Sequence, residues 1–589
     1  MTEIMKKNLS TKFILFGIIL LAAFFRFYNL NWDQGFHLHP DERAIVLAVV
    51  KLAPPHSLSQ FLSPDSPWNP HFFAYGSFPF YLLWLAGLAM SLINPLFSQY
   101  DQINLVGRAI SAFSDLLTIL VIFRMGRKLF SKNIGLLAAF FYSVSVLPIQ
   151  LSHFYAVDTL LTLFIIITIY QLMLFYEKPT IWRSLLIGLF FGLALATKIS
   201  AFVLIASIAV TLVVDFALLF FRAPHMPRQW LPHLPVLTKH LITYAVLIGV
   251  ATGITYTIAE PYALIDFKEL QAQTIQQSQM TSNAFTFPYT LQYVGKIPYL
   301  YEAKNIFFYG LGPLLGTLAF IGAANFTFIA FAKAKTGRRA KELILLSFFA
   351  AYVFVVGKFA IGFMRYMLPV YPLLSLFAAF AAFWLFTFLK KNIKNQLIYY
   401  FSLFIFQFSF LIWPLSFLHI YTQKNTRSLA TDWINTSIPA GKTLAIEHWD
   451  DSLPLTGQEK YHMLTLTLYD PDTPEKWMNT DRELKQTDFV IIASNRLYVP
   501  LQKLTDCQHL PPDRCYRTTA VYYRHLFTGQ NVLMDDASGQ EVRFEKVAEF
   551  SDNPTIPFLG IPINDQGADE SFTVYDHPKV MIFKKIEPL

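Results

Sequence analysis

Long apolar segments, separated by short loops rich in Lys and Arg, fill the first 420 residues of the chain. A helix that spans a bilayer needs about 20 mostly apolar residues, and short basic loops stay on the cytoplasmic side. Together these rules predict about eleven spanning helices and a cytoplasmic N-terminus. The predicted spans lie near residues 13–30, 105–124, 134–150, 157–176, 184–198, 200–221, 241–259, a stretch that ends near 333, 343–360, 367–389 and 397–418.

The composition agrees with a multi-pass protein of the plasma membrane. Apolar residues make up 54% of the chain and charged residues 15%, against about 25% charged residues in soluble proteins. The net charge of +8 does not indicate a nucleic-acid partner, because the Lys and Arg residues cluster between apolar segments. No small-residue cleavage site follows the first apolar segment, so we interpret it as an uncleaved span and not as a signal peptide.

Residues 78–94 are apolar enough to cross a bilayer, but a span at this position would disturb the alternation of cytoplasmic and outer loops that the other spans produce. Counting them as a span would place the basic cluster at 124–132 outside and invert every later loop. We therefore interpret them as a helix lying on or dipping into the outer leaflet, where its Phe, Tyr and Trp side chains suit the interface. The helix then belongs to an outer loop of residues 31–104.

The same alternation leaves residues 421–589 outside the cytoplasm as a soluble α/β domain, which we interpret as a binding or acceptor-positioning module. Helices are predicted at 427–436, 474–484 and 496–504, and strands at 442–446, 488–493, 543–549 and 578–584. Cys507 and Cys515 lie in this domain. The sequence leaves open whether they close a small disulfide loop or remain free thiols.

Ionisable side chains gather where the chain is predicted to meet the outer membrane boundary. Such residues are costly next to a bilayer unless they are solvated or functional. Each has a structural alternative: Pro40 and the acids after it can begin a helix, Asp158 can cap one, and the cations can reach lipid head groups. The acids are Asp41, Glu42 and Asp158; the cations are Arg108, Lys198, Lys358 and Arg365; His39, His153 and Tyr366 lie beside them.

These acids and cations are all predicted to lie at the outer membrane boundary. Their common position indicates a substrate with a phosphate head and an apolar tail, such as a sugar linked to polyprenyl phosphate. Fixed Arg and Lys side chains would stabilise the leaving phosphate, and an ionised Asp would accept the proton of an acceptor hydroxyl. One carboxylate facing the donor predicts a single displacement with inversion. Neither the sugar nor the acceptor, which can be a lipid, a glycan or a protein, is readable from the sequence. No cofactor is indicated. A divalent metal ion near Asp41 is neither assigned nor excluded, since the sequence shows no complete ligand set for it.

The order of these motifs resembles the GT-C superfamily of membrane glycosyltransferases, in particular the family-39 type that includes protein O-mannosyltransferases and lipid A aminoarabinose transferases. The matching segments are His39 to Glu42, Gly107 to Ala109, Ser152 to Asp158, Ala196 to Lys198 and Arg365 to Pro372.

This resemblance implies that Asp41 is the catalytic base, with Glu42 beside it, and that Arg108 and Arg365 bind the donor phosphate or organise the site. We place Lys198, Lys358 and Tyr366 in the same group as these two arginines, and treat His39, His153 and Asp158 as candidates for the sugar or acceptor site. O-mannosyltransferases usually have Arg in place of His153 and a large luminal domain between later spans, which is absent here, so the resemblance does not extend to protein O-mannosylation. The segments 447–451 and 575–578 are similar to the tails of uncharacterised prokaryotic members.

Three other functional classes were weighed. A transporter of a lipid or glycan would place charges near the bilayer midplane, whereas here the span interiors are nearly uncharged, with Asp215 as an exception. A glycoside hydrolase needs two facing carboxyl groups. The side chains of the neighbours Asp41 and Glu42 diverge, which weakens this alternative, although Asp158 could supply the second carboxyl group. The Asp470-Pro471-Asp472 motif resembles the metal site of nucleotide-sugar transferases, but a turn is the simpler interpretation.

Overall fold

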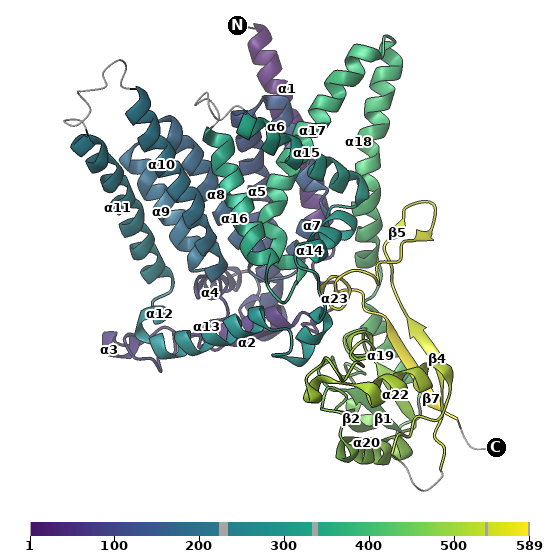
Figure 1. The fold of residues 1–589 in the computed structure, drawn as a ribbon. Coiled ribbons are helices and arrows are strands. Elements are labelled where there is room, and N and C mark those ends of the chain that lie inside the picture. The colour runs from purple at the N-terminus through teal and green to yellow at the C-terminus, as the bar shows by residue number, and fades with distance from the viewer. Residues whose placement is uncertain (1, 223–233, 333–339, 536–539, 587–589) are drawn as a thin grey trace.

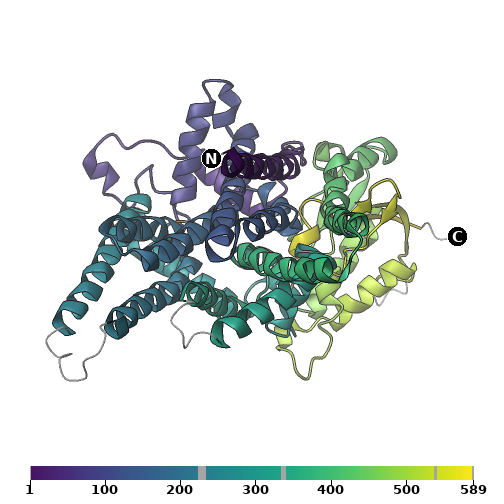
Figure 2. The ribbon, with the colours of Figure 1, turned by 90° about the horizontal axis from the view of Figure 1, so that it is seen from above.

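The computed structural model describes residues 2–222, 234–332, 340–535 and 540–586. Long helices run side by side in a bundle, and a small α/β domain is attached at one end (Figure 1). Viewed along the helices, this domain lies on the opposite side of the bundle from α10 and α11 (Figure 2). Two basic loops used to predict the topology, with Arg228 and with the run from Lys333 to Arg339, lie outside the described residues.

Every predicted span is helical, which confirms an α-helical polytopic fold. Eight described helical segments are long and apolar enough to cross a membrane, or nine if α6 and α7, which are bent by 58°, form one broken span. The total of about eleven spans therefore stays a prediction. The helices are α1 (Thr2–Phe27), α5 (Tyr100–Leu129), α6 (Lys132–Ser143), α7 (Val146–Ser152), α8 (Asp158–Glu177), α9 (Ile181–Leu195), α10 (Leu204–Arg222), α11 (Leu234–Ala259), α15 (Pro313–Ala332), α16 (Ala340–Gly357), α17 (Tyr371–Asn392) and α18 (Gln396–Leu418).

Helix α8 separates two charged ends of the bundle. At its C-terminus, Glu177 forms ion pairs with Lys128 of α5 and Lys341 of α16. At its N-terminus, Asp158 binds Lys198. A helix of 20 residues is about 30 Å long, so the basic loops and the candidate site lie about one bilayer thickness apart.

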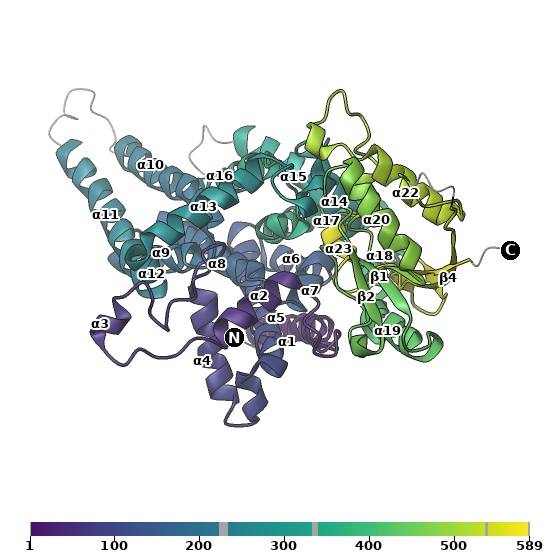
Figure 3. The ribbon, with the colours of Figure 1, turned by 90° about the horizontal axis from the view of Figure 1, so that it is seen from below.

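Short helices cover the end of the bundle that carries Asp158. Helix α13 (Phe267–Ser282) runs across the ends of the long helices, at the same end of the bundle as α2 (Pro40–Val49) and α4 (Phe78–Met90) (Figures 1 and 3). Helix α4 has 13 residues, fewer than a span requires, as expected for a surface helix; its depth in the bilayer stays a prediction. The remaining short elements of this layer are α3 (Leu58–Phe61), η1 (Pro95–Ser98), η2 (Ile199–Val203), α12 (Tyr262–Ile265), η3 (Pro288–Tyr293), α14 (Leu300–Asn305), η4 (Ile306–Gly310) and η6 (Met364–Val370).

The α/β domain is built on a five-stranded sheet with strand order β2-β1-β3-β7-β4. The first three strands in this order are parallel, and β7 and β4 are antiparallel to their neighbours. Successive side chains of a strand face opposite sides, so Leu444 packs under α19 while Ala445 packs under α20 and α22. The elements are α19 (Thr426–Ser437), β1 (Thr443–Glu447), β2 (His462–Leu466), α20 (Pro474–Gln486), β3 (Phe489–Ile492), α21 (Tyr498–Leu501), α22 (Arg517–Thr528), β4 (Phe544–Phe550), the hairpin β5 (Thr555–Ile556) and β6 (Ile561–Pro562), α23 (Glu570–Thr573) and β7 (Val580–Lys585).

The segment 565–577 ties this domain to the helical bundle. The buried His577 contacts Asp565 at 2.8 Å through Nε2 and Asp576 at 2.5 Å through Nδ1. Burial alone would lower its pKa, but the two carboxylates outweigh that effect and raise the pKa of His577 to about 10. Asp576 also accepts hydrogen bonds from Gln150 of α7 and from Tyr421, just after α18. The junction therefore consists of buried, paired groups.

Cys507 and Cys515 form a disulfide with a Cα–Cα distance of 5.3 Å. Disulfides persist in oxidising compartments. The bond therefore agrees with the predicted extracytoplasmic position of this domain.

Cysteine labelling tests the orientation of the bundle. Leu58→Cys places a thiol at an exposed position of the loop 31–104, and Lys178→Cys places one at the opposite end of α8. Because both native cysteines are bonded to each other, a membrane-impermeant maleimide applied to intact cells should label only the Leu58→Cys variant. Labelling of Lys178→Cys alone would place the candidate site on the cytoplasmic side.

Candidate active site

Asp41 and Glu42 begin helix α2 but point to different partners. His39 caps this helix, accepting a hydrogen bond from the Glu42 backbone N–H at 3.3 Å through Nδ1, and Pro40 occupies the first helical position. Adjacent helical residues are rotated by about 100° from one another. The two carboxylates therefore enter two separate charge clusters.

Glu42 belongs to a buried cluster centred on Arg108 of α5. The Arg108 guanidinium binds Glu42 at 2.6 and 2.9 Å and Asp33 at 2.6 and 3.0 Å. The Tyr155 backbone N–H also donates to Glu42 at 2.9 Å. None of the three charged side chains is exposed, so this cluster fastens the start of the outer loop to the bundle.

Asp41 belongs to a second cluster, which has two acids and two cations. Arg365 of η6 forms an ion pair with Asp41, and its Nε lies 3.9 Å from Asp158 Oδ2. The other oxygen of Asp158 accepts a hydrogen bond from Lys198 at 2.8 Å. The four side chains come from four separate segments, and all four were predicted from the sequence.

Aromatic rings surround the cations of this second cluster. Lys198 Nζ lies 4.5 Å from the ring centre of Tyr366 and 5.5 Å from that of Tyr75. The Arg365 guanidinium carbon lies 5.0 Å from the ring centre of Phe363. Such rings attract a cation without competing for its hydrogen-bond donors, so the donors stay available for a ligand.

Asp41 is ionised and accessible. Burial opposes its ionisation, but the charges of Arg365 and Lys198 and a hydrogen bond from the Tyr75 hydroxyl outweigh burial and hold the pKa of Asp41 below its ordinary value. The Asp41 side chain is 25% exposed to solvent. A substrate can therefore reach a carboxylate that carries its charge at neutral pH.

The backbone before Asp158 is strained. Val157 has a φ of +56°, a conformation that β-branched residues rarely adopt and that costs of order 1–3 kcal/mol. The turn lets the Asp158 backbone N–H donate to the Ala156 carbonyl at 2.7 Å. It places Asp158 as the first residue of α8, directed at Lys198.

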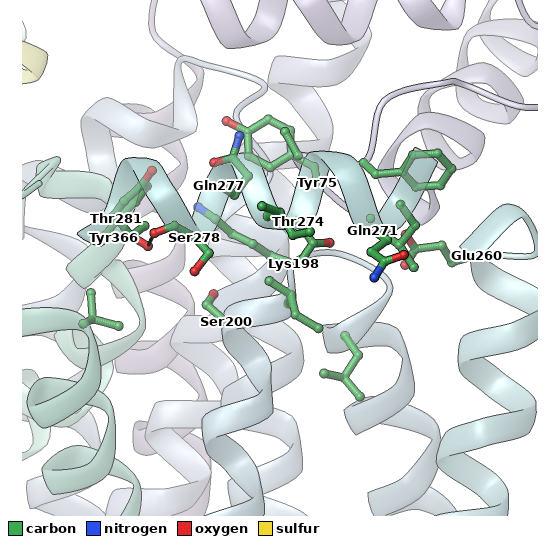
Figure 4. Close-up of a pocket in the computed structure, with 18 of the residues that line it drawn as sticks. Tyr75, Lys198, Ser200, Glu260, Gln271, Thr274, Gln277, Ser278, Thr281 and Tyr366 are labelled. Carbon is green, nitrogen blue, oxygen red and sulfur yellow. Dashed lines mark hydrogen bonds between the residues drawn. The ribbon is translucent and has the colours of Figure 1, made fainter. Parts of the chain in front are cut away.

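A cavity of about 510 Å³ adjoins the second cluster (Figure 4). Lys198, Tyr366 and Tyr75 belong to its wall, and Glu260 lies at the end away from Tyr366. The rest of the lining is largely apolar and comes from the loop before α4, from the junction of α9 and η2, from α13 and from the C-terminal part of α16 with the loop after it; it includes Phe73, Leu195, Ile199, Phe267, Leu270, Ile275, Val356 and Phe359. The cavity therefore offers an apolar chamber with one cation, Lys198, in its wall.

Glu260 is buried in the cavity wall. Burial raises the pKa of its carboxyl to about 8, although hydrogen bonds with the Tyr256 hydroxyl and the Ser77 backbone oppose the shift. The group is therefore neutral at pH 7. The cavity keeps its apolar character at this end.

The other predicted site residues lie outside the second cluster. His39 packs against the rings of Phe154 and Tyr575, and burial lowers its pKa to about 3. Both ring nitrogens of His153 contact backbone carbonyls at 2.9 Å, and its ring stacks on Tyr421. Lys358 is exposed and forms no ion pair with the described residues. These placements favour a structural role for the two histidines.

Two tyrosines of the second cluster were missed from the sequence. Tyr75 lies in the outer loop and Tyr575 in the α/β domain, where burial raises the pKa of Tyr575 to about 12 although the Arg365 charge opposes the shift. Neither tyrosine lies in the sequence segments that contain Asp41 or Asp158. The one available signal for Tyr575 was the group of polar and aromatic residues at 575–578.

The described residues do not fit a divalent metal site. Asp41 and Asp158 are already paired with cations, and no group of three or more His, Cys, Asp or Glu side chains within the described ranges could hold a metal ion. Asp472 of the Asp470-Pro471-Asp472 motif binds Lys476 and the backbone N–H groups of Thr518 and Thr519. That motif is a turn that holds the start of α22.

Comparison with known proteins supports the resemblance predicted from the sequence. A family model described as dolichyl-phosphate-mannose-protein mannosyltransferase matches residues 78–257. No curated protein gives a significant match.

Solved structures of three membrane glycosyltransferases match at low identity. The Archaeoglobus fulgidus oligosaccharyltransferase AglB, in complex with an inhibitory peptide and a dolichol-phosphate, matches with 13% identity and a TM-score of 0.48, over 99% of this chain and 89% of its own. Cupriavidus metallidurans ArnT bound to undecaprenyl phosphate matches with 13% identity and a TM-score of 0.42, over 83% and 94%. The S. cerevisiae protein O-mannosyltransferase complex Pmt1-Pmt2, bound to its sugar donor, matches with 13% identity and a TM-score of 0.32, over 44% and 34%.

The two clusters should differ in what they contribute to stability. Arg108→Met leaves Asp33 and Glu42 buried without their cation, and we expect it to lower the free energy of unfolding by about 3–5 kcal/mol. Arg365→Met should cost less, because Asp41 reaches water and Asp158 keeps Lys198. Chemical unfolding in detergent micelles measures both values.

Arg43→Met is the matched control, because the Arg43 side chain is 37% exposed in its ion pair with Asp451. It should cost no more than about 1 kcal/mol. An Arg108→Met variant as stable as this control would show that the buried cluster does not hold the loop.

Proposed function

We propose that the protein is a glycosyltransferase that moves a sugar from a polyprenyl-phosphate carrier to an acceptor hydroxyl at the extracytoplasmic membrane face, with Asp41 as general base. The observation that carries this proposal is the position of an ionised, accessible Asp41 beside two cations that belong to or adjoin an apolar cavity. The matching family model bears the name of an enzyme that uses a polyprenyl-phosphate sugar.

The isoprenoid chain and the phosphate of the donor match the apolar chamber and the cations of the site. The apolar chamber between α13 and α16 suits the first isoprene units of the lipid, since burying apolar surface is favourable. The phosphate would lie against Lys198 and Arg365, which supply charge-assisted donors. The sugar is then held next to Asp41.

Transfer requires one bond to form and one to break. The acceptor oxygen attacks the anomeric carbon, its proton passes to the Asp41 carboxylate, and the bond to the phosphate oxygen breaks with its electron pair remaining on the lipid phosphate. Arg365 and Lys198 stabilise the charge that develops on the phosphate. Attack opposite the leaving group inverts the anomeric centre.

The ion pair between Asp41 and Arg365 explains how the base is activated. Arg365 lowers the pKa of Asp41 when no donor is bound, and a weaker base accepts a proton less readily. A bound phosphate competes for Arg365 and weakens this effect. Asp41 therefore becomes more basic when the donor arrives.

The remaining predicted residues receive supporting roles. Glu42 and Arg108 are positioning residues, because their bonds to each other and to Asp33 hold the start of α2. His39 caps α2 and fixes the position of Asp41. Asp158 holds Lys198 toward the cavity, so that Lys198 and Arg365 are both available to the phosphate of the donor.

Replacement of the base tests the proposal. With purified protein and a panel of polyprenyl-phosphate sugars, the wild type should release lipid phosphate from at least one donor. Asp41→Asn should lower that rate about 10²–10⁴-fold, the usual contribution of a general base. The exposed Asp65→Asn, in the same outer loop, should match the wild type. An Asp41→Asn variant with the full rate would exclude Asp41 as the base.

The cavity carboxyl predicts a pH dependence of donor binding. Glu260 is neutral below its pKa of about 8 and ionised above it, and an ionised carboxylate in an apolar cavity opposes binding of an isoprenoid chain. The KM for the donor should therefore rise above pH 8, approaching about tenfold per pH unit.

Glu260→Gln should abolish this rise, because its amide does not ionise. Glu269→Gln changes an exposed carboxyl on the neighbouring α13 and should keep the wild-type profile. A donor KM that is constant from pH 7 to 9 in the wild type would place the isoprenoid chain elsewhere.

A further inference from the structure

The carboxyl ends of β1 and β3, two of the three parallel strands of the α/β domain, carry a polar cluster. In open α/β sheets, ligands bind outside this end of the strands. Here β1 ends at Glu447 and is followed by Asp450, and β3 is followed by Ser494 and Arg496. Asp450 binds Ser494 and Arg427, so the cluster is held rigidly.

This end of the sheet faces Asp41. Asp451 forms an ion pair with Arg43 of α2 at 3.2 Å. Arg496 binds Glu570 at 2.8 Å, and its guanidinium carbon lies 6.0 Å from the ring centre of Tyr575. The Tyr575 ring in turn lies 4.3 Å from His39, two residues before Asp41. The strand ends are therefore connected to the segment of the candidate base by direct side-chain contacts.

Trp449 is the exposed aromatic residue of this cluster. Its φ of +72° is an outlier for a bulky side chain, and such strain persists only where neighbours enforce it. Arg496 supplies one restraint by donating to the Trp449 carbonyl at 3.1 Å. The ring is 43% exposed and lies 6.2 Å from Tyr289, whose pKa is raised by burial and by the Asp41 carboxylate.

Several buried oxygens of the cluster have no hydrogen-bond donor within the described part of the chain. They are Glu447 Oε2, Asn495 Oδ1 and Glu570 Oε2. A buried acceptor without a partner is costly. A ligand rich in hydroxyl groups would supply the missing donors.

We propose that this cluster is the acceptor site and that the acceptor is a carbohydrate. The inference rests on the proposed glycosyltransferase function. A pyranose ring has an apolar C–H face and a rim of hydroxyl groups, which match the Trp449 ring and the acids, amide and Arg496 around it. A peptide acceptor that added a strand would use the free edges at β2 or β4, which are not the strand ends that face Asp41.

The site places the two substrates on opposite sides of the base. The donor lies toward Lys198 and the cavity, and the glycan lies toward Trp449. One glycan hydroxyl forms the new bond to the anomeric carbon and gives its proton to Asp41, while the lipid phosphate leaves with the electron pair of the broken bond. The α/β domain thus selects the acceptor.

Direct binding tests the proposal independently of turnover. Full-length protein in nanodiscs is mixed with trisaccharides of glucose, N-acetylglucosamine, mannose, galactose and rhamnose, and in parallel with short Ser- and Thr-containing peptides. Saturation-transfer NMR reports which of these probes bind. At least one trisaccharide should bind the wild type, and Trp449→Phe should keep that affinity within about threefold because a ring remains.

Trp449→Gly separates a binding role from a structural one. Glycine adopts a positive φ without strain, so the thermal unfolding midpoint should not fall. Loss of the ring should nevertheless weaken trisaccharide binding at least about tenfold. Trp182→Ala, which removes a ring that is 76% exposed at the opposite end of the bundle, should bind as the wild type does.

Wild-type binding of peptides and not of trisaccharides would overturn the inference, as would a Trp449→Gly variant with unchanged affinity. Failure of the proposed function gives a different pattern. Trisaccharide binding would then depend on Trp449 while Asp41→Asn left the release of lipid phosphate unchanged.

Discussion

Pairing of buried charges at one membrane boundary is the constraint on which the rest of the structure depends. A carboxylate or guanidinium in a low-dielectric region is tolerated only with a partner of opposite charge. Arg108 meets this requirement for Asp33 and Glu42, and it thereby joins the first outer loop to α5. Lys198 is the cationic partner of Asp158, and Arg365 is the cationic partner of Asp41. The first set of charges is fully bonded and structural, whereas the second keeps accessible atoms and unused donors, as a site for an anionic ligand requires.

The sequence predicted those parts of the molecule that depend on local pattern. Apolar segments of spanning length located the helices, and Pro40 after His39 located the start of α2. The four residues of the second cluster were found because each is a charge at a predicted boundary. Glu42 was assigned to the site beside Asp41 because the family resemblance pairs the two residues, although neighbouring helical residues are rotated by about 100° and their side chains diverge. Lys358 was grouped with the cations on position alone, but its side chain is exposed and outside the cluster.

Other parts could not be read from the sequence because they depend on tertiary packing. Strand β2 is a partly exposed edge strand whose residues show no clear apolar run. Tyr75 joins the site through its hydrogen bond to Asp41 and its contact with Lys198, and Tyr575 joins it through a ring contact with His39, near the other end of the chain. Trp449 gains its significance from a backbone angle and a hydrogen bond with Arg496, neither of which leaves a sequence signal. Charge is therefore easier to place from sequence than the aromatic residues around it.

The junction at residues 565–577 has a consequence for biogenesis. Tyr575 and His577 follow all the candidate membrane helices among the described residues, yet Tyr575 packs on His39, shortly after the first of them. During synthesis, the helices can insert and pair their charges while these residues are still within the ribosome or the translocon. In the proposed orientation, the proposed site is then completed only after the α/β domain has been exported and folded. The proposed donor cavity would form first and the proposed acceptor side last, so that activity would begin only when export is complete.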